Sequence, residues 1–496
     1  MQIPILVDEA SAVGLQDQIF DQIHTLILDG RLPAGAALPA SRSLARDLGV
    51  SRNTVLGAYQ RLAEQGLVRT REQAGTYVAP HPHALGPRQA LHTPDDPRDA
   101  QDDLGAALQR RLQFRAQPHR VLSPHPVPPR YDFWIGQVDP RLYPTRAWRT
   151  LIARMLAAPA EPLCRYGDPQ GLPQLRAAIA AYVGAARGIA TDASRVLITN
   201  GIQEGLSLLA RLLVRPGVEV ALEDPCYRGA SSVFADHGAR LCPVPVDGDG
   251  IDPAALPPSA ALVYATPSHQ YPTGATLSLA RREALLAWGR WAGAYIVEDD
   301  YDSDFYYDEA PLPALKSDDR HDQVIYLGTF SKCLGAGLRL GYMILPRRLV
   351  GPARAAKALL SNCQPWLDQA ALAAFVAEGD HAHHLRQLRR ICAARRDHLR
   401  AAIAHQFPGA RVAGAHSGMH LAVHLPPSMP GAQRIEPAAR RAGVGVYGVE
   451  SANAQLLDAR RSGALDRYLL FGYAALDETA ISEAILALRR TIDTLR

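Results

Sequence analysis

The spacing of apolar and polar positions divides the chain into three zones. Residues 10–79 carry apolar positions at helical spacing, followed by two short runs of alternating polarity, which predicts short helices and a small hairpin. Residues 80–130 hold ten prolines, too many for continuous secondary structure, so this zone is predicted to be a linker. Residues 131–496 alternate strand patterns with helical patterns. We therefore expect two domains joined by a linker.

The third zone predicts an α/β domain with a mostly parallel sheet. Its strand candidates are apolar at consecutive positions, as in a sheet that is covered on both faces. They read RVLIT, EVALED, ALVYAT, AYIVEDD and VIYLGT. Ligands of such sheets bind at the carboxyl ends of the strands, so functional side chains are expected just after these runs.

Composition narrows the class of protein. Hydrophobic residues make up 47% and charged residues 21% of the chain, which is typical of globular proteins and excludes global disorder. No apolar run reaches about eighteen residues, and MQIPILVDEA has acids where a signal peptide is positive, so we expect a soluble cytoplasmic protein. The six cysteines lack C-x-x-C spacing, which predicts neither a metal site nor a disulfide framework.

Basic residues are concentrated near the start of the chain. The net charge of +4 is too small to indicate nucleic-acid binding by itself. Between residues 31 and 71, however, seven arginines are balanced by only two acidic residues. Just three of the 53 basic residues are lysines, so chemistry that needs a primary amine has few candidates. They are Lys316, Lys332 and Lys357.

The stretch PASRSLARDLGVSRNTVLGAYQRLAEQG predicts two helices joined by a tight turn. Ser41 is expected to cap the first helix, Gly49 to end it and Ser51 to cap the second. LVRTREQAGTYVA then predicts two strands around a turn at residues 73–75. The second helix offers Arg52, Asn53, Thr54, Tyr59 and Gln60 on or near its exposed side as candidate contacts to DNA phosphates and base edges, and the hairpin offers Arg69 and Arg71.

A small dimerisation or capping domain is the alternative interpretation of this segment. The stretch GRLPAGAALPASRSLARDLGVSRNTV resembles the GntR-type winged helix nearly without interruption. The resemblance implies double-stranded operator DNA as a partner, and it places Arg42 and Arg52 where the family contacts DNA. DNA binding is therefore favoured.

The strongest chemical signal is VIYLGTFSKCLGAGLRLGY at residues 324–342. An apolar strand delivers Thr329, Ser331 and Lys332 to its carboxyl end, and Arg339 follows one loop later. An aldehyde cofactor with a phosphate needs such a set, because an amine forms the Schiff base while hydroxyls and a guanidinium bind the phosphate. A surface lysine at a strand end would be the plainer interpretation of an isolated Ser-Lys pair.

Other strand ends supply matching groups. Asp299 suits a protonated pyridine nitrogen, although spacing alone leaves Asp300 as an alternative. Tyr301 is a candidate partner of the ring hydroxyl, and Tyr227 is either an aromatic cover of the ring or a core residue. A helix N-terminus, which attracts phosphate, is predicted at Gly201, Ile202 and Gln203.

Together these motifs resemble the fold type I pyridoxal 5'-phosphate (PLP) aminotransferases over residues 131–496. With the winged helix in front, the whole chain resembles the MocR/GabR family of transcriptional regulators. The resemblance implies that Lys332 bonds PLP and that Asp299 contacts its pyridine nitrogen. The phosphate residues that it implies are Thr329, Ser331, Arg339, Ile202 and Gln203. It also implies a homodimer, often domain-swapped head to tail, in which Tyr166 of RYGDPQGLPQLR reaches the phosphate of the partner subunit.

Two positions depart from the aminotransferase pattern. Asn-Pro-Thr-Gly is replaced by YPTG at residues 271–274, so the usual asparagine contact to the ring hydroxyl is absent or moved to His269. Where aminotransferases carry an arginine for the substrate carboxylate, YLLFGYA places Leu470, with Arg467 nearby. Losing such a charge-assisted pair costs about 1.5 to 3 kcal/mol. Arg228 is a candidate carboxylate ligand from the other side.

These observations favour a DNA-binding regulator that senses PLP or a small amine or amino acid through Lys332 and controls genes of vitamin B6 or amine metabolism. The missing arginine favours PLP as the effector. Half-reactions of transamination are compatible with this function. One alternative is a working aminotransferase with an accessory DNA-binding domain. Another, a regulator that has lost PLP, is disfavoured because the lysine, aspartate and phosphate elements are all present.

Overall fold

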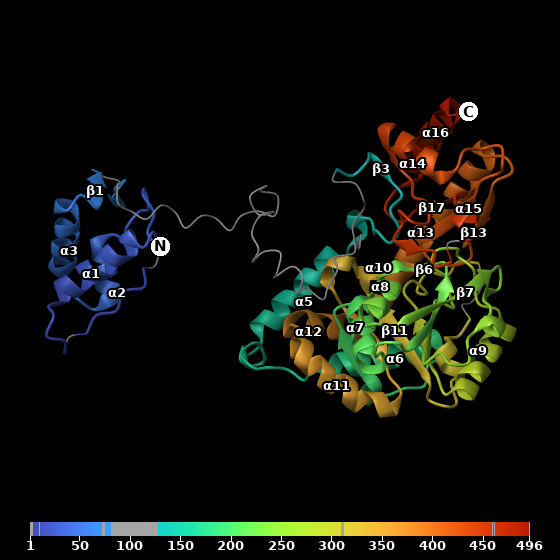
Figure 1. The fold of residues 1–496 in the computed structure, drawn as a ribbon, viewed down its shortest axis with the longest axis horizontal. Helices are drawn as coiled ribbons and strands as arrows, with labels where there is room; N and C mark the ends of the chain where they lie inside the picture. The colour runs from blue at the N-terminus through green and yellow to red at the C-terminus, as the bar shows by residue number, and fades with distance from the viewer. Residues whose placement is uncertain are drawn as a thin grey trace. The chain divides into compact units, whose positions relative to one another are not determined.

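The computed structural model describes residues 3–8, 10–71, 75–80, 127–308, 312–458, 460 and 462–495. The chain forms two compact units, Met1–Arg115 and Ala116–Arg496 (Figure 1). Residues 81–126 of the predicted linker and residues 72–74 of the predicted hairpin, which include two of its three turn residues, lie outside the described residues. Every helix in the described ranges is too short or too polar to cross a lipid bilayer.

The N-terminal unit contains the predicted helices and hairpin. Its described elements are α1 (Leu15–Leu28), α2 (Ser41–Leu48), α3 (Arg52–Glu64) and the antiparallel strands β1 (Val68–Arg71) and β2 (Gly75–Val78). Buried apolar side chains from all five elements form one core. These contacts stabilise helices that would be marginal in isolation at this length.

The turn between α2 and α3 uses two of the three predicted capping residues. Gly49 ends α2 in the left-handed conformation with φ 69°, which glycine adopts without steric cost. Ser51 caps α3, since its Oγ accepts a hydrogen bond from the Thr54 amide at 3.1 Å. The prediction that Ser41 caps α2 is wrong. Ala40 has the extended backbone of the cap position, so the helix begins one residue earlier and Ser41 is already helical.

In the described part of the C-terminal unit, eight strands form one sheet. In spatial order they are β4 (Val196–Thr199), β12 (Gly341–Ile344), β11 (Val324–Thr329), β10 (Tyr295–Asp299), β9 (Leu262–Ala265), β5 (Glu219–Asp224), β7 (Arg240–Asp247) and β8 (Gly250–Ile251). Strands β11, β10, β9, β5 and β7 run parallel, while β12 is antiparallel to both of its neighbours. The predicted mostly parallel sheet is therefore confirmed.

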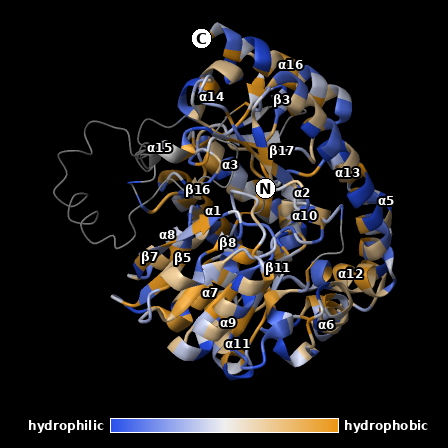
Figure 2. Ribbon diagram, turned by 90° about the vertical axis from the view of Figure 1, so that its right-hand side faces the viewer, coloured by the Kyte–Doolittle hydropathy of each residue, from blue (hydrophilic) through white to orange (hydrophobic). Residues whose placement is uncertain are grey.

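Both faces of this sheet are covered, which explains the unbroken apolar runs of its strands. One face packs against α7 (Ile202–Leu213), α8 (Arg228–Asp236) and α11 (Arg347–Ser361). The other face packs against α6 (Pro173–Arg187), α12 (Trp366–Ala377) and α9 (Leu279–Ala292). Successive residues of β11 show the alternation, because Leu327 lies on the first face and Tyr326 on the second. Hydropathy colouring accordingly shows mostly orange strands and helices with blue outer positions (Figure 2).

A smaller antiparallel sheet belongs to the C-terminal part of the chain. It contains β13 (Arg411–Ala413), β14 (His420–His424) and β17 (Tyr468–Gly472), and its helices are α13 (Asp380–Gln406), α14 (Ala432–Arg441) and α16 (Glu478–Thr494). Two short strand pairs connect distant segments: β3 (Tyr131–Asp132) with β15 (Val444–Gly445), and β6 (Cys226–Tyr227) with β16 (Ala454–Gln455). Further helices are α5 (Thr145–Ala157), α10 (Ser331–Leu334) and α15 (Ser462–Leu465).

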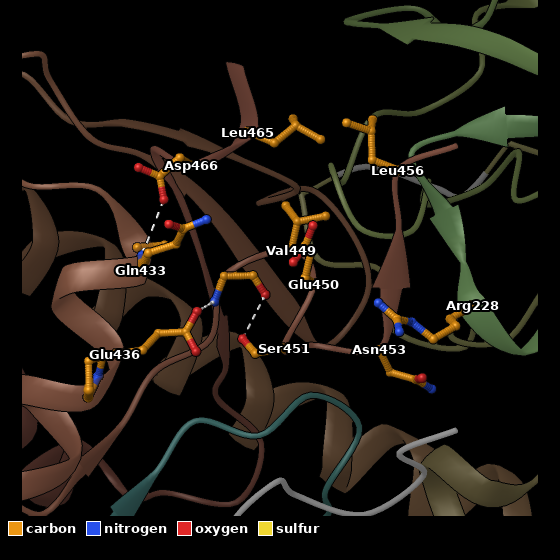
Figure 3. Close-up of a pocket in the computed structure, with 13 residues that line it drawn as sticks. Arg228, Gln433, Glu436, Val449, Glu450, Ser451, Asn453, Leu456, Leu465 and Asp466 are labelled. Carbon is orange, nitrogen blue, oxygen red and sulfur yellow. Dashed lines mark hydrogen bonds between the residues drawn. The ribbon is translucent and has the colours of Figure 1, made fainter. Parts of the chain in front are cut away.

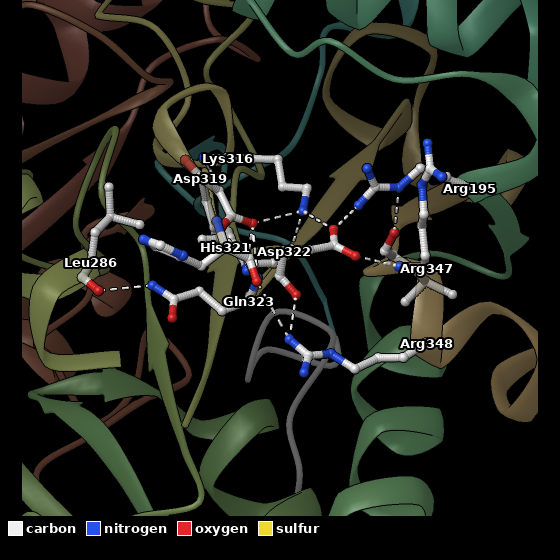
Figure 4. Close-up of polar contacts among 12 residues, drawn as sticks. Arg195, Leu286, Lys316, Asp319, His321, Asp322, Gln323, Arg347 and Arg348 are labelled. Carbon is white, nitrogen blue, oxygen red and sulfur yellow. Dashed lines mark hydrogen bonds and ion pairs between the residues drawn. The ribbon is translucent and has the colours of Figure 1, made fainter. Parts of the chain in front are cut away.

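Two of the three lysines are held in ion pairs. Just before β11, Lys316 Nζ lies 2.9 Å from Asp319 Oδ2 within a network of polar contacts (Figure 4). Lys357 Nζ lies 3.1 Å from Glu204 Oε2. Among the described residues, Lys332 Nζ has neither an ion pair nor a hydrogen bond. Lys332 is therefore the lysine whose amine is available for chemistry.

Candidate functional site

The predicted site residues meet at the carboxyl end of the parallel strands. Thr329 ends β11 and Asp299 ends the neighbouring β10. Thr329 also pairs with Gly341 of β12, which pairs with Thr199 at the end of β4. Gly201 follows β4, and a Cβ on Gly341 would lie only 2.8 Å from Gly201 Cα. The glycine turn before α7 therefore lies beside the end of β11.

Thr329, Ser331, Arg339 and the start of α7 form a group that suits an anion. Thr329 Oγ1 lies 2.9 Å from Ser331 Oγ and accepts the Ser331 amide at 3.1 Å. Arg339 donates to the Asn200 carbonyl at 2.6 Å, and a Cβ on Gly201 would lie 3.0 Å from its guanidinium. The first amides of a helix have no partner inside it and attract anions. Two hydroxyls, a guanidinium and a helix N-terminus thus converge.

Ile202 and Gln203 supply two of those amides, but the Gln203 side chain turns to an aromatic ring instead. Tyr227 Oη donates to Gln203 Oε1 at 3.2 Å, and Gln203 Nε2 donates to the Gly229 carbonyl at 3.1 Å. Burial, with the nearby charge of Asp299, raises the pKa of Tyr227 to about 12. Tyr227 is therefore a neutral ring in a fixed orientation.

Asp299 and Asp300 are both buried, but their hydrogen bonding differs. Arg187 Nε at 2.8 Å and Tyr326 Oη at 2.6 Å both donate to Asp300. Burial would raise the pKa of Asp300, but Arg187 holds it below its ordinary value. Asp299 Oδ2 accepts from Tyr264 Oη at 2.6 Å, whereas its buried Oδ1 has no partner among the described residues. The geometry therefore favours Asp299 as the carboxylate that can accept a ligand.

Burial raises the pKa of Asp299 to about 7, despite the hydrogen bond from Tyr264. The pKa of a buried carboxyl group with one unpaired oxygen changes strongly when that oxygen gains a hydrogen-bond partner. A cationic N–H donor at Oδ1 would stabilise the charged form and lower this pKa. Oδ1 of Asp299 thus has the properties of a binding atom for a protonated nitrogen.

Lys332 lies in α10, next to Ser331, and is half-buried. Burial lowers the pKa of its amine, while the carboxylates of Asp302 and Asp299 act in the opposite direction. A lowered pKa increases the unprotonated fraction that can attack a carbonyl carbon. Gly136, with φ 81°, lies against this amine, because a Cβ on Gly136 would overlap Lys332 Nζ. Sequence reasoning missed Gly136, which follows no strand of the kind that marked the other site residues.

His269 lies beside Tyr301 and is completely buried. Its Nδ1 is 3.3 Å from Tyr301 Oη and 2.9 Å from Asp302 Oδ2. The sequence did not single out Asp302, nor Tyr264, which lies inside β9 and bonds Asp299 across 35 positions of sequence. The only sequence signal for Asp302 was its place in the acidic run that follows β10.

The residues considered for a carboxylate do not gather in one place. Leu470 is fully buried in β17 and packs with Trp134. Arg467 donates hydrogen bonds to two backbone carbonyls, so it does not replace the missing arginine. Arg228 donates to a backbone carbonyl at 3.2 Å and lines a cavity of about 460 Å³. Tyr166 is 88% exposed in the single chain.

Most of the predicted DNA contacts lie on the surface of the N-terminal unit. The exposed side chains are those of Arg42, Arg52, Asn53, Gln60 and Arg69. The expectation that Tyr59 lies on the exposed side is wrong, because its ring is buried in the core of this unit. Thr54 is half-buried, and its hydroxyl lies 2.8 Å from the Ser51 hydroxyl in the cap of α3. The Arg71 side chain lies outside the described residues. The start of α3 and the hairpin therefore present basic and amide groups to solvent.

Comparisons with known proteins give relatives for both units. Residues 15–78 match the family model "Bacterial regulatory proteins, gntR family", and residues 135–456 match "Aminotransferase class I and II". The chain is 35% identical over 397 residues to the probable rhizopine catabolism regulatory protein MocR of Rhizobium meliloti, covering 79% of this chain and 77% of that protein.

Two further relatives bear on the site. The HTH-type pyridoxine biosynthesis transcriptional regulator PdxR of Corynebacterium glutamicum is 30% identical over 418 residues, with 84% of this chain and 85% of that protein covered. The solved structure of LysN, an α-aminoadipate aminotransferase of Thermus thermophilus, superposes with a TM-score of 0.66 at 29% identity over 73% of this chain and 92% of that chain. That crystal contains N-(5'-phosphopyridoxyl)-L-leucine.

Proposed function

The chain belongs to the MocR-type regulators, in which a GntR-type DNA-binding domain precedes a class I and II aminotransferase domain, and from this premise we propose that it controls transcription in response to a small molecule bound at Lys332. Residues 10–79 bind operator DNA and residues 131–496 hold PLP. Residues 80–130 are the linker between these two domains. Since its DNA partner lies in the cytoplasm, the protein acts there.

The match between three groups of the site and three parts of PLP carries this proposal. Within the described part of the chain, Lys332 offers an amine without an ion pair and Asp299 a buried oxygen without a hydrogen-bond partner, while the end of β11 with the start of α7 offers an anion pocket. PLP has an aldehyde, a pyridine nitrogen and a phosphate to fill these places. When bound, it supplies an electrophilic carbon for an amine and a ring that withdraws electrons.

The surrounding residues of the chain orient the ligand and exclude water. Tyr227, held by Gln203, covers the ring, and Tyr301 donates to the ring hydroxyl. Asp299 holds the ring nitrogen through Oδ1 while Tyr264 keeps its other oxygen in place. Because the carboxyl group is buried, its hydrogen bond to a cationic nitrogen is stronger than the same bond in water.

A homodimer is part of the proposal. Tyr166 is 88% exposed although it belongs to a motif that in the family reaches a phosphate. Leu163, on the same segment, is 49% exposed. Large exposed side chains of this kind are typical of surfaces that a partner covers. Tyr166 therefore contacts the phosphate site of the partner subunit.

The effector is PLP itself or a small amine. Arg228 lines the cavity of about 460 Å³ together with the acidic residues Glu436, Glu450 and Asp466 (Figure 3). More carboxyl groups than guanidinium groups in this cavity favour the amine, whose charge is positive, over the anionic PLP as a ligand of the cavity itself. Leu470 provides no ion pair for an α-carboxylate, a loss of about 1.5 to 3 kcal/mol. The regulated genes accordingly belong to vitamin B6 or amine metabolism, and the name of the PdxR relative, a regulator of pyridoxine biosynthesis, supports the first of these.

A working aminotransferase is the second candidate, because the lysine, the aspartate and the anion pocket are all present. The buried Leu470 argues against it, since an amino acid and a keto acid both need an anchor for the carboxylate. With an amino donor and a keto acid in excess, the PLP-loaded protein should convert at most about one equivalent. Sustained multiple turnover would establish the enzyme instead.

The regulator is tested by DNA footprinting with the full chain. The probe is DNA that flanks its own gene, and the footprint is recorded with PLP and without it. We expect the wild-type footprint to change with PLP, whereas Lys332→Ala and the charge-retaining Lys332→Arg should bind DNA and give a footprint that PLP does not change. A PLP response that persists in both variants would contradict the proposal.

A further inference from the structure

Beside the proposed PLP site lies a buried polar cluster, of which the sequence singled out only His269, as a candidate contact of the ring hydroxyl. Its members, His269, Asp302 and His420, come from three separate segments and are all buried. His269 Nδ1 lies 2.9 Å from Asp302 Oδ2 and 3.3 Å from Tyr301 Oη. The ring centroids of His269 and His420 are 4.6 Å apart. The cluster therefore connects a residue of the PLP site to a buried carboxylate.

Three glycines make room for the imidazole. Gly274, Gly414 and Gly418 have φ values of 75°, 76° and 79°, in the region that favours glycine. A Cβ on Gly414 would lie 2.8 Å from His269 Nε2, and one on Gly274 would lie 3.2 Å from it. A Cβ on Gly418 would overlap His269 and crowd Asp302. The surrounding backbone thus fixes the ring with Nδ1 toward Asp302.

The hydrogen bonds determine where the protons lie. A carboxylate only accepts, so His269 Nδ1 carries a proton and donates to Asp302. A ring nitrogen that already donates has no lone pair to accept another hydrogen bond. The Tyr301 hydroxyl, although 3.3 Å from the same nitrogen, therefore keeps its proton for another acceptor. The ring hydroxyl of PLP is such an acceptor.

The charge of Asp302 acts on the amine of Lys332 as well as on His269, which it contacts directly. His420 Nε2 donates to the Pro272 carbonyl at 3.1 Å, and burial holds the pKa of His420 well below its ordinary value, so it is neutral. Among the described residues, the other titratable groups near the cluster are Asp299 at the end of β10, Tyr301 just after it, Tyr271 from the loop after β9, Lys332 from α10, Tyr307, and Tyr473 just after β17. Asp302, ahead of Asp299, raises the pKa of the lysine amine against the effect of burial.

We propose that Asp302 and His269 are positioning residues of the PLP site. Asp302 fixes the His269 tautomer that leaves the Tyr301 proton to the ring hydroxyl, and its charge favours a proton on the Lys332 nitrogen. This inference rests on the proposed function, because it assigns roles within the same site. The asparagine of the aminotransferase pattern is neutral and cannot supply this charge.

The first test titrates the visible absorption of the PLP-loaded full chain from about pH 5 to about pH 10. Asp302→Asn should lower the midpoint by about one pH unit, a tenfold loss of proton affinity. Asp302→Glu keeps the charge and should restore the wild-type midpoint. Asp308→Asn removes a carboxylate that pairs with Arg396 outside the cluster, and it should change nothing. An unmoved midpoint in Asp302→Asn would overturn the role of the charge.

The second test measures the position of the visible band. His269→Gln should shift the band maximum, since Tyr301 loses the partner that directs its proton, and the shift should disappear in the Tyr301→Phe background. A shift of equal size in both backgrounds would overturn the role assigned to His269. This variant also carries the test alone if Asp302→Asn does not fold.

Different results would overturn the proposed function and the roles of Asp302 and His269. A wild-type protein that develops no visible band with PLP would overturn the proposed function, and this inference with it. A normal wild-type band whose midpoint and maximum are unaffected by these variants would overturn the inference only.

Discussion

A methyl group at position 136 should weaken PLP loading without unfolding the protein. Gly136 has φ 81°, and a Cβ there would overlap Lys332 Nζ. In Gly136→Ala the lysine side chain has to move away from the place where its amine meets the ligand. The effect on function should therefore be much larger than the effect on stability.

The cost in stability follows from two separate contributions. An alanine at positive φ costs about 1 to 2 kcal/mol in backbone conformation. The clash itself adds little, because Nζ ends a flexible side chain that rotates away. Gly217 offers a matched control, with φ 87° and nothing within 4 Å of an added Cβ. Gly217→Ala carries the same backbone cost without the clash, so both variants should lose about 1 to 2 kcal/mol in unfolding free energy.

The assay combines urea unfolding with PLP titration followed by visible absorption. Gly217→Ala should load PLP like the wild type, and Gly136→Ala should load at least about tenfold more weakly, a loss of about 1.4 kcal/mol. If Gly136→Ala loads PLP with wild-type affinity, the place assigned to the Lys332 amine is wrong. If it loses several times more stability than Gly217→Ala, the clash involves more than the lysine.

Three further predictions concern charge and capping. Removing Arg187 leaves Asp300 buried without its ion pair, so Arg187→Met should lower the free energy of unfolding by about 3 to 5 kcal/mol, measured in urea. A loss below about 1 kcal/mol would show that the Arg187–Asp300 pair is not the buried ion pair described above. Without PLP, burial raises the pKa of Asp299 to about 7 in the folded protein, whereas the pKa of an aspartate in the unfolded chain is about 4. Stability from this group should therefore be present below about pH 4 and lost as the pH rises to about 7, and Asp299→Asn should flatten that slope in unfolding curves. Ser51→Ala removes the α3 cap and should cost the N-terminal unit about 1 kcal/mol by thermal unfolding, while the same change at Ser41, which is no cap, should cost less.

The sequence predicted the sheet because its strands are buried on both faces. Leu327 and Tyr326 point to opposite faces and are both buried, so the run in β11 is apolar throughout and easy to recognise. The rule that ligands bind at strand ends then located Thr329 and Asp299. The capping prediction at Ser41 failed because Ser and Ala occupy consecutive positions at the start of α2 and sequence alone does not fix the first helical residue.

The remaining site residues depend on contacts between distant parts of the chain. The choice between Asp299 and Asp300 rests on Arg187, which is 113 positions away from Asp300 in the sequence. Gly136 is close to Lys332 only because the chain folds back across almost 200 positions, about half of the C-terminal unit. Asp302 gains its role only when His269 packs beside it. Local patterns carry no information about such pairs.

Borohydride reduction of the PLP-loaded full chain, followed by proteolysis and mass spectrometry, tests the central claim most directly. We expect a phosphopyridoxyl group on the peptide that contains Lys332 and none on the peptides that contain Lys316 or Lys357. A chain that carries no such group after loading and reduction, or that carries it on either of the ion-paired lysines, would contradict the account.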